Sequence, residues 1–140
     1  MKKILLIGAT GVLGKAFTEY LSQKNHLFIA DNKLSSLKEL TNKFKVPYKY
    51  CDVTKKGSIR KLVIDAVNEL DGIDVVIHNI AQTSELILKK TKKFPDFSSI
   101  KIDTWNKDFE VNLTSVFLLA QEMNDIWKKN KELKSFIAIS

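Results

Sequence analysis

The chain has 140 residues, 44% of them hydrophobic and 28% charged, with a formal net charge of +7. This length fits a single domain with a small core, and no apolar run is long enough to span a membrane. The apolar stretch before Gly8 is too short for a signal peptide, so we expect a cytoplasmic protein. The single cysteine, Cys51, excludes an internal disulfide and is expected to fill space at the end of a buried strand.

The positive charge is concentrated in lysines between Lys89 and Lys93 and between Lys128 and Lys134. A nucleic-acid-binding protein would carry one basic face interleaved with aromatic residues. These lysines are instead expected in a loop and at a helix end, where they suit the helix dipole. We therefore expect no nucleic acid and no membrane as partner. No histidines or carboxylates have metal-ligand spacing, so no metal site is expected.

The first 21 residues predict a strand, a glycine turn and a helix. An unbroken apolar run over residues 4–7 is typical of a strand buried on both faces. Gly8, Gly11 and Gly14 follow it, and a helical pattern of apolar residues comes next: Leu13, Ala16, Phe17, Tyr20 and Leu21. Such a turn presents backbone N–H groups and a positive helix end to a phosphate. The residues expected to contact a dinucleotide here are Gly8, Thr10, Gly11, Val12 and Leu13.

A second apolar strand over residues 27–30 ends in Asp31, about 20 residues after the glycine turn. An acid at this position accepts hydrogen bonds from a ribose with a free 2′-hydroxyl and repels a 2′-phosphate. We therefore expect NAD as the cofactor. NADP stays open as the second choice, because Lys15 and Lys33 are close to this acid in the sequence.

The rest of the chain alternates between strands and helices. We expect a helix over 34–44, a strand over 46–51, a helix capped by Thr54 and ended by Asp71-Gly72, and a strand over 73–78. A short helix with an excursion over 79–102, a helix over 103–129 capped by Asp103 or Thr104, and a strand over 135–140 complete the pattern. The helix residues expected to face inward include Leu34, Leu37, Leu40, Phe44, Trp105, Phe109, Val116, Phe117, Ala120 and Met123. This alternation predicts an α/β fold, a three-layer, Rossmann-type, doubly wound parallel sheet with helices on both faces.

Polar residues directly after the predicted strands are the next candidates for chemistry. Asp52 and Asn79 fall at the carboxyl edge of the sheet, where ligands bind in such folds. Asp52 could equally supply charge to the following helix, and Asn79 could be an ordinary turn asparagine. His78 is interpreted as a hydrogen-bonded histidine of the core or of the sheet edge rather than as a catalytic base.

Two further candidates depend on the helical pattern. Asn112 shares an apolar stripe with Trp105 and Phe109, so we expect it to point inward. It could bond to the backbone of a neighbouring strand or support chemistry. Tyr20 and Lys24 form a Tyr-x-x-x-Lys pair, which is interpreted as core packing with a surface lysine.

Together these residues resemble the short-chain dehydrogenase/reductase family. The similar segments are the glycine turn at 8–14, Asp31, residues 51–54, residues 74–81 ending in Asn79-Ile80-Ala81, and residues 105–117, the most specific of them. The resemblance implies that Asp52, Val53, Asn79 and Ala81 contact the cofactor. It also implies that Asn112 supports the active site by holding a water of the proton relay, and that the helix from Asp103 helps to form a homo-oligomer.

The family's catalytic Tyr-x-x-x-Lys lies beyond the position matched by Ser140. We therefore expect residues 1–140 to be a dinucleotide-binding (Rossmann) domain that is incomplete at its C-terminus, truncated after the fifth strand and catalytically incompetent alone. The complete protein would transfer a hydride between NAD(P) and a carbonyl or alcohol substrate. The alternative is a non-catalytic NAD(P)-binding regulatory module. The apolar strand over 136–140 would lie at an edge and promote association.

Overall fold

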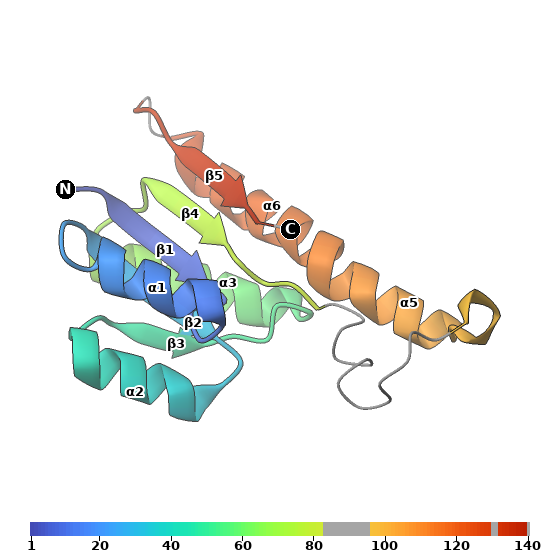
Figure 1. Cartoon of the computed structure of the whole chain (residues 1–140). Coiled ribbons are helices and arrows are strands. Elements are labelled where there is room, and N and C mark those ends of the chain that lie inside the picture. The colour runs from blue at the N-terminus through green and yellow to red at the C-terminus, as the bar shows by residue number, and fades with distance from the viewer. Residues whose placement is uncertain (83–95, 130–131, 140) are drawn as a thin grey trace.

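The computed structural model describes residues 1–82, 96–129 and 132–139. This part of the chain contains five strands in one parallel sheet of order β3-β2-β1-β4-β5 (Figure 1). The strands are β1 (Lys3–Ile7), β2 (His26–Asp31), β3 (Tyr48–Tyr50), β4 (Val75–His78) and β5 (Ser135–Ala138). The predicted α/β fold with a parallel, doubly wound sheet is confirmed.

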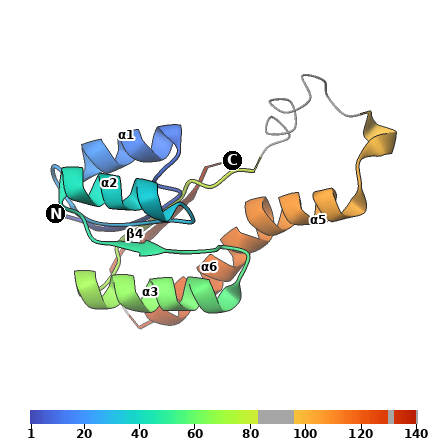
Figure 2. The ribbon, with the colours of Figure 1, turned by 90° about the horizontal axis from the view of Figure 1, so that it is seen from below.

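Helices cover both faces of the sheet (Figure 2). On one face lie α1 (Val12–Leu21) and α2 (Leu34–Phe44), and on the other lie α3 (Lys56–Leu70) and α6 (Ser115–Trp127). A π-helical segment, η2 (Glu110–Thr114), joins α6 to α5 (Ile102–Phe109), and a 3₁₀ turn, η1 (Phe97–Ser99), precedes α5. The helix α5 extends beyond the sheet in both views. None of the described helices is long and apolar enough to cross a membrane.

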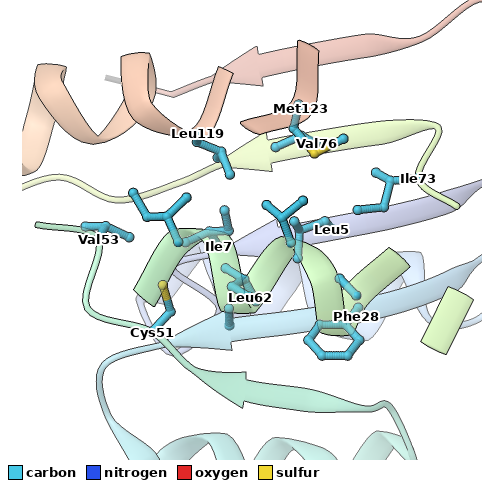
Figure 3. Close-up of a cluster of buried hydrophobic side chains, with 14 of the residues drawn as sticks. Leu5, Ile7, Phe28, Cys51, Val53, Leu62, Ile73, Val76, Leu119 and Met123 are labelled. Atoms are coloured by element: carbon cyan, nitrogen blue, oxygen red, sulfur yellow. The ribbon is translucent and has the colours of Figure 1, made fainter. Parts of the chain in front are cut away.

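The continuous apolar run of β1 is explained by two separate cores. Ile4 and Leu6 pack into the core that α1 and α2 cover, whereas Leu5 and Ile7 pack into the core beneath α3 and α6 (Figure 3). Alternate residues of a strand point to opposite faces, so a strand buried on both faces must be apolar throughout.

The chain order creates a switch point at β1. The chain passes from β1 to β2 and β3 on one side, and then returns to β4 on the other side. Open α/β sheets bind ligands outside the carboxyl ends of the strands where the strand order reverses in this way.

Several predicted helix boundaries are wrong in detail. Thr54 does not cap α3, because its hydroxyl donates to Asp52 Oδ1 over 2.7 Å and the helix begins after Lys55. The helix α5 begins at Ile102 after Lys101, so neither Asp103 nor Thr104 is its cap. The predicted end of α3 is confirmed, since Asp71 and Gly72 have φ of +54° and +112°.

The predicted inward face of the long helix is mostly wrong. Trp105, Phe109 and Phe117 are exposed, and Ala120 is also on the exposed side. The buried stripe consists of Val111, Ser115, Leu119 and, as predicted, Met123. The cause is twofold: α5 lies beyond the sheet, and the π segment contains an extra residue per hydrogen-bonded turn, which rotates the face of α6.

The inner face of α1 also differs from the prediction. Tyr20 is 69% exposed, and Leu13 and Ala16 are exposed too, whereas Gly14 and Thr18 are buried. The absence of a side chain at Gly14 allows α1 to lie against the glycine turn, which turns this face toward the sheet. In α2, Leu37 and Leu40 are buried as predicted, but Leu34 is exposed. The lysines between Lys89 and Lys93, most of the predicted excursion, and Ser140 lie outside the described residues.

Candidate dinucleotide-binding site

The three glycines of the turn have different structural roles. Gly8 has a φ of +84°, and a Cβ there would lie 2.2 Å from the Asn79 carbonyl oxygen. A Cβ on Gly14 would lie 2.1 Å from the Gly8 carbonyl oxygen. Gly11 has only an ordinary contact, 3.8 Å to the Gly8 oxygen. Gly8 and Gly14 are therefore required by backbone packing, and Gly11 leaves space for a ligand.

The N-terminus of α1 begins at this open position. Gly11 is the N-cap residue in an extended conformation, and no side chain of a described residue caps the helix. The first turn contains no acidic residue. The first amides of a helix have no intrahelical acceptor, and the helix dipole adds partial positive charge there. The end of α1 is thus suited to an anion such as a diphosphate.

A cavity of about 460 Å³ lies over the carboxyl ends of β1 to β4. Eight of the predicted site residues line it: Gly8, Thr10, Gly11, Asp31, Asp52, Val53, Asn79 and Ala81. Val12 and Leu13 are exposed in the first turn of α1 and are not among the lining residues. Nine further residues line the cavity that were not predicted to contact the cofactor: Asn32, Lys33, Tyr50, Cys51, Thr54, Ile80, Gln82, Lys107 and Val111.

Asp31 connects the end of β2 to the glycine turn. The residue is 7% exposed, and its Oδ2 accepts the Thr10 N–H over 2.9 Å. Its Oδ1 accepts the N–H groups of Asn32 and Lys33 over 2.8 and 3.2 Å. An ionised carboxylate has about four acceptor positions. Three hydrogen bonds therefore leave one position for a ligand hydroxyl.

Asp52 is held ionised at the end of β3. Hydrogen bonds from the Thr54 hydroxyl and the Thr54 amide, with an ion pair to Lys55 at 3.4 Å, hold the pKa of Asp52 below its usual value. Cys51, directly before it, is buried, and burial raises the pKa of its thiol. Cys51 packs in the hydrophobic core, as interpreted, but the strand that it follows, β3, is partly exposed and not buried.

Asn79 connects the end of β4 to the same turn. Its N–H donates to the Ile7 carbonyl over 2.9 Å, and its Nδ2 donates to the Gly8 carbonyl over 3.2 Å. These bonds fix Asn79 beside the close approach to Gly8. Asn79 is thus more than an ordinary turn residue, because it joins two walls of the cavity.

His78 is a hydrogen-bonded core residue, as interpreted from the sequence. It is buried, and its Nε2 lies 2.9 Å from the Ser115 hydroxyl, which itself donates to the Val111 carbonyl. This arrangement assigns the ring proton to Nε2. Burial lowers the pKa of His78, which favours the neutral ring.

Asn112 does not point inward as predicted, since it is an exposed residue of the π segment. Its Oδ1 accepts the Gln82 N–H and its Nδ2 donates to the Gln82 carbonyl, both over 2.7 Å. The side chain therefore forms hydrogen bonds with the backbone of the segment that follows β4, which was one of the two interpretations proposed.

Among the described residues, no group of three or more histidine, cysteine or carboxylate side chains could hold a metal ion.

The arrangement of this sheet and its helices matches known structures. A short-chain dehydrogenase from Mycobacterium smegmatis has a TM-score of 0.83 and 18% identity, with 98% of this chain and 56% of that chain covered. Residues 12–140 match the family model described as Enoyl-(Acyl carrier protein) reductase. The chain belongs to the short-chain dehydrogenase/reductase family.

Two curated relatives are similar to this family member along most of its length. An uncharacterized oxidoreductase of Staphylococcus saprophyticus is 28% identical over 119 residues, and an NAD-dependent glycerol dehydrogenase of Listeria innocua is 26% identical over 123 residues. The matches cover 82% and 86% of this chain but 45% of each relative. The chain therefore spans about half the length of the curated relatives it matches.

The residues that sequence reasoning missed differ in how they could have been found. Gln82 directly follows Asn79-Ile80-Ala81, so extending that motif by one residue would have included it. Lys33 lies two residues after Asp31, and the sequence indicated it only for its effect on the choice between NAD and NADP. Lys107 lies on α5, and no strand-end pattern indicates that its helix reaches the cavity.

Proposed function

We propose that this chain is the cofactor-binding portion of an NAD-dependent oxidoreductase. The complete protein would transfer a hydride between a nicotinamide cofactor and the carbonyl or alcohol carbon of a small-molecule substrate. The observation that carries this proposal is the uncapped N-terminus of α1 at the open Gly11, facing a cavity that Asp31 and Asp52 also line.

The lining residues divide among the parts of a dinucleotide. The diphosphate would lie on the amides of the turn and the first turn of α1: Gly8, Thr10, Gly11, Val12 and Leu13. Asp31 would accept a ribose hydroxyl, with Asp52 and Val53 beside the adenine. Asn79 and Ala81 would lie beside the nicotinamide nucleoside. The cofactor supplies the hydride chemistry when bound, and these residues bind and orient it.

NAD is proposed over NADP because of the charge and hydrogen bonding of Asp31. Its remaining acceptor position suits a hydroxyl, and its charge would repel a 2′-phosphate. Lys33 lines the same cavity and would weaken this discrimination. One of the relatives is named as NAD-dependent, which agrees with the choice.

Titration calorimetry with NADH and NADPH tests the proposal. We expect heat with both cofactors and tighter binding of NADH. A folded sample that binds neither cofactor would refute the cofactor-binding role itself. Equal or tighter binding of NADPH would refute the choice of NAD alone.

We propose that the chain by itself does not complete the reaction. Hydride transfer to a carbonyl needs a proton donor, and in the family this donor is the tyrosine of a Tyr-x-x-x-Lys pair. The only such pair in the sequence is Tyr20 and Lys24. Tyr20 is exposed on α1 and does not line the cavity. Turnover by the 140-residue chain in a dehydrogenase assay would contradict this proposal.

Asn112 is proposed to have a supporting role. Its bonds to Gln82 use one acceptor position and one N–H. One N–H and one lone pair remain for a water molecule of a proton relay.

A non-catalytic NAD-binding module is the second candidate function. The predicted cofactor contacts and the cavity lie within these 140 residues, whereas a suitable Tyr-x-x-x-Lys pair does not. Reading the DNA beyond the Ser140 codon in all three frames distinguishes the candidates. A serine and a Tyr-x-x-x-Lys within a few dozen codons would favour the enzyme, and their absence would favour the module.

A homo-oligomer is proposed from an exposed apolar stripe on α5, η2 and α6. The stripe consists of Ile102, Trp105, Phe109, Leu113 and Phe117, which recur every three or four residues. The rings of Trp105 and Phe109 are tilted by 33° to each other, with centroids 4.7 Å apart. Exposed apolar surface of this kind marks interaction sites. Light scattering should detect an oligomer that Phe117→Glu dissociates. A monodisperse monomer would contradict the proposal, and would also contradict association through the β5 edge.

A further inference from the structure

The segment after β4 forms one wall of the cavity and is anchored at both ends. We call residues Asn79–Gln82 the β4 wall. At its start, the Asn79 N–H donates to the Ile7 carbonyl over 2.9 Å. At its end, the backbone N–H and C=O of Gln82 both pair with the Asn112 amide over 2.7 Å. Ile80 and Ala81 lie between these anchors and line the cavity.

The continuous helical segment formed by α5, η2 and α6 is called the helical rod below. The Gln82 side chain adds a second contact with this rod. Its Nε2 donates to Asp108 Oδ1 over 3.0 Å. Asp108 and Asn112 are four residues apart, so they lie on the same side of the rod and reach the same residue. Gln82 and Asp108 are both half-buried, and the acceptor is charged, which makes this bond stronger than one between neutral groups.

The β4 wall lies opposite the end of the cavity formed by Asp31 and Asp52. With the diphosphate on α1 and one ribose on Asp31, the second nucleoside must extend over the end of β4. The lining there comes from the β4 wall together with Lys107 and Val111 of the rod. Any rotation of α5 would therefore change both sides of this end of the cavity.

We propose that Gln82 and Asp108 are positioning residues for the nicotinamide half of the bound dinucleotide. Their hydrogen bond fixes the β4 wall against α5 and so sets the space into which the nicotinamide nucleoside fits. This inference rests on the proposed cofactor-binding function. Neither side chain is required for the adenosine half, which lies over β2 and β3.

The test compares NADH with ADP, which keeps the adenosine and the diphosphate but lacks the nicotinamide nucleoside, by calorimetry on the full 140-residue chain. Gln82→Ala and Asp108→Ala should each weaken NADH binding about tenfold, the effect expected from one charge-assisted hydrogen bond. Both variants should change ADP binding less than about twofold, because that ligand has no nucleoside to place against the β4 wall. Substitution of a residue that is important only for folding would weaken the binding of both ligands equally.

Two further variants separate the hydrogen bond from the side chains themselves. Asp108→Asn keeps an acceptor oxygen and should retain most of the NADH affinity. Gln82→Glu should place two carboxylates together and weaken NADH binding, and the double variant Gln82→Glu/Asp108→Asn should restore it with donor and acceptor exchanged. Asp103→Ala is the matched control, since it removes an acid from the first turn of α5 without touching the cavity.

The possible failures are distinguishable. If the wild type binds neither NADH nor ADP, the proposed function fails, and this inference fails with it. If the wild type binds both ligands, but the variants weaken the binding of both ligands equally or of neither ligand, the inference alone is overturned. Failure of the double variant to recover NADH affinity would likewise overturn the role of this hydrogen bond.

Discussion

The two walls of the cavity are built in different ways. The glycine-turn wall, residues 8–11 with Asp31, is held by backbone contacts too close for any side chain and by three N–H groups on one carboxylate. The β4 wall is held at its far end by side chains of α5 and η2. We infer that substitutions in the first wall affect folding, except at the open Gly11, and that substitutions at the end of the second wall mainly affect binding.

The largest effect is expected at Gly8. Gly8→Ala would place a methyl group within 2.2 Å of the Asn79 carbonyl oxygen and force an L-residue to a φ of +84°. The Asn79 backbone cannot move aside as a flexible side chain can. We therefore expect the free energy of unfolding to fall by about 3 kcal/mol or more. Urea denaturation measures it.

Gly57→Ala is the matched control for this prediction. Gly57 lies in α3, and a Cβ there has no described atom within 4 Å. This variant should be more stable by up to about 1 kcal/mol. Equal stability of the two variants would show that the close approach of Gly8 to Asn79 is unimportant.

The next largest effect is expected for the substitution Asp31→Asn. An amide keeps one oxygen but directs an NH₂ group at N–H donors, so one or more of the three hydrogen bonds must break. We expect a loss of about 2 kcal/mol in stability, and a smaller preference for NADH over NADPH, because the negative charge is removed. Thermal unfolding and calorimetry check the two parts. An unchanged cofactor ratio would show that Asp31 holds the turn without selecting the cofactor.

Gly11→Ala should separate binding from folding within the glycine-turn wall. The nearest atom to a Cβ at Gly11 is 3.8 Å away and φ is −69°, so the folded chain accepts alanine without strain. The methyl group would occupy space needed by the diphosphate. We expect NADH binding to weaken about tenfold, or about 1.4 kcal/mol, with an unchanged urea midpoint. A normal affinity would place the diphosphate elsewhere.

The smallest effect is expected at the opposite edge of the sheet. Asp74 accepts hydrogen bonds from Lys134 Nζ over 2.8 Å and from the Lys3 N–H over 2.9 Å, and these bonds lower the pKa of Asp74. A carboxylate with a lowered pKa in the folded state stabilises the protein above its unfolded pKa, near 4. That stabilisation is lost as the pH falls through the lower, folded-state pKa.

Asp74→Asn should therefore cost about 1 kcal/mol at neutral pH and remove part of the acid dependence of stability below about pH 4. Its affinity for NADH should not change, because Asp74 lies at the amino edge of the sheet, away from the cavity. Denaturation at pH 7 and pH 3 tests the first part. A change in NADH affinity would show that the position of the β4 wall depends on both ends of β4.

The sequence patterns that succeeded are local and contiguous. The strand, glycine turn and helix, and the strand ending in Asp31, can be recognised because the apolar run and the three glycines lie within the first 31 residues. The prediction failed for the helical rod. The apolar stripe through Trp105, Phe109 and Asn112 has the right spacing for a buried face, yet these residues are exposed. Periodicity shows that a helix has an apolar face but does not show what covers it.

The parallel α/β fold, the glycine turn and the acid at the end of β2 follow from the order of the amino acids, because strand and helix periods and glycine spacing depend on neighbouring residues. Packing between distant segments sets which glycine is open to a ligand, which face of α6 is buried and which residues contact Gln82. These features depend on the π segment and on the approach of segments 26 to 71 residues apart. Small rotations of a packed helix exchange one set of neighbours for another, and no local pattern encodes that choice.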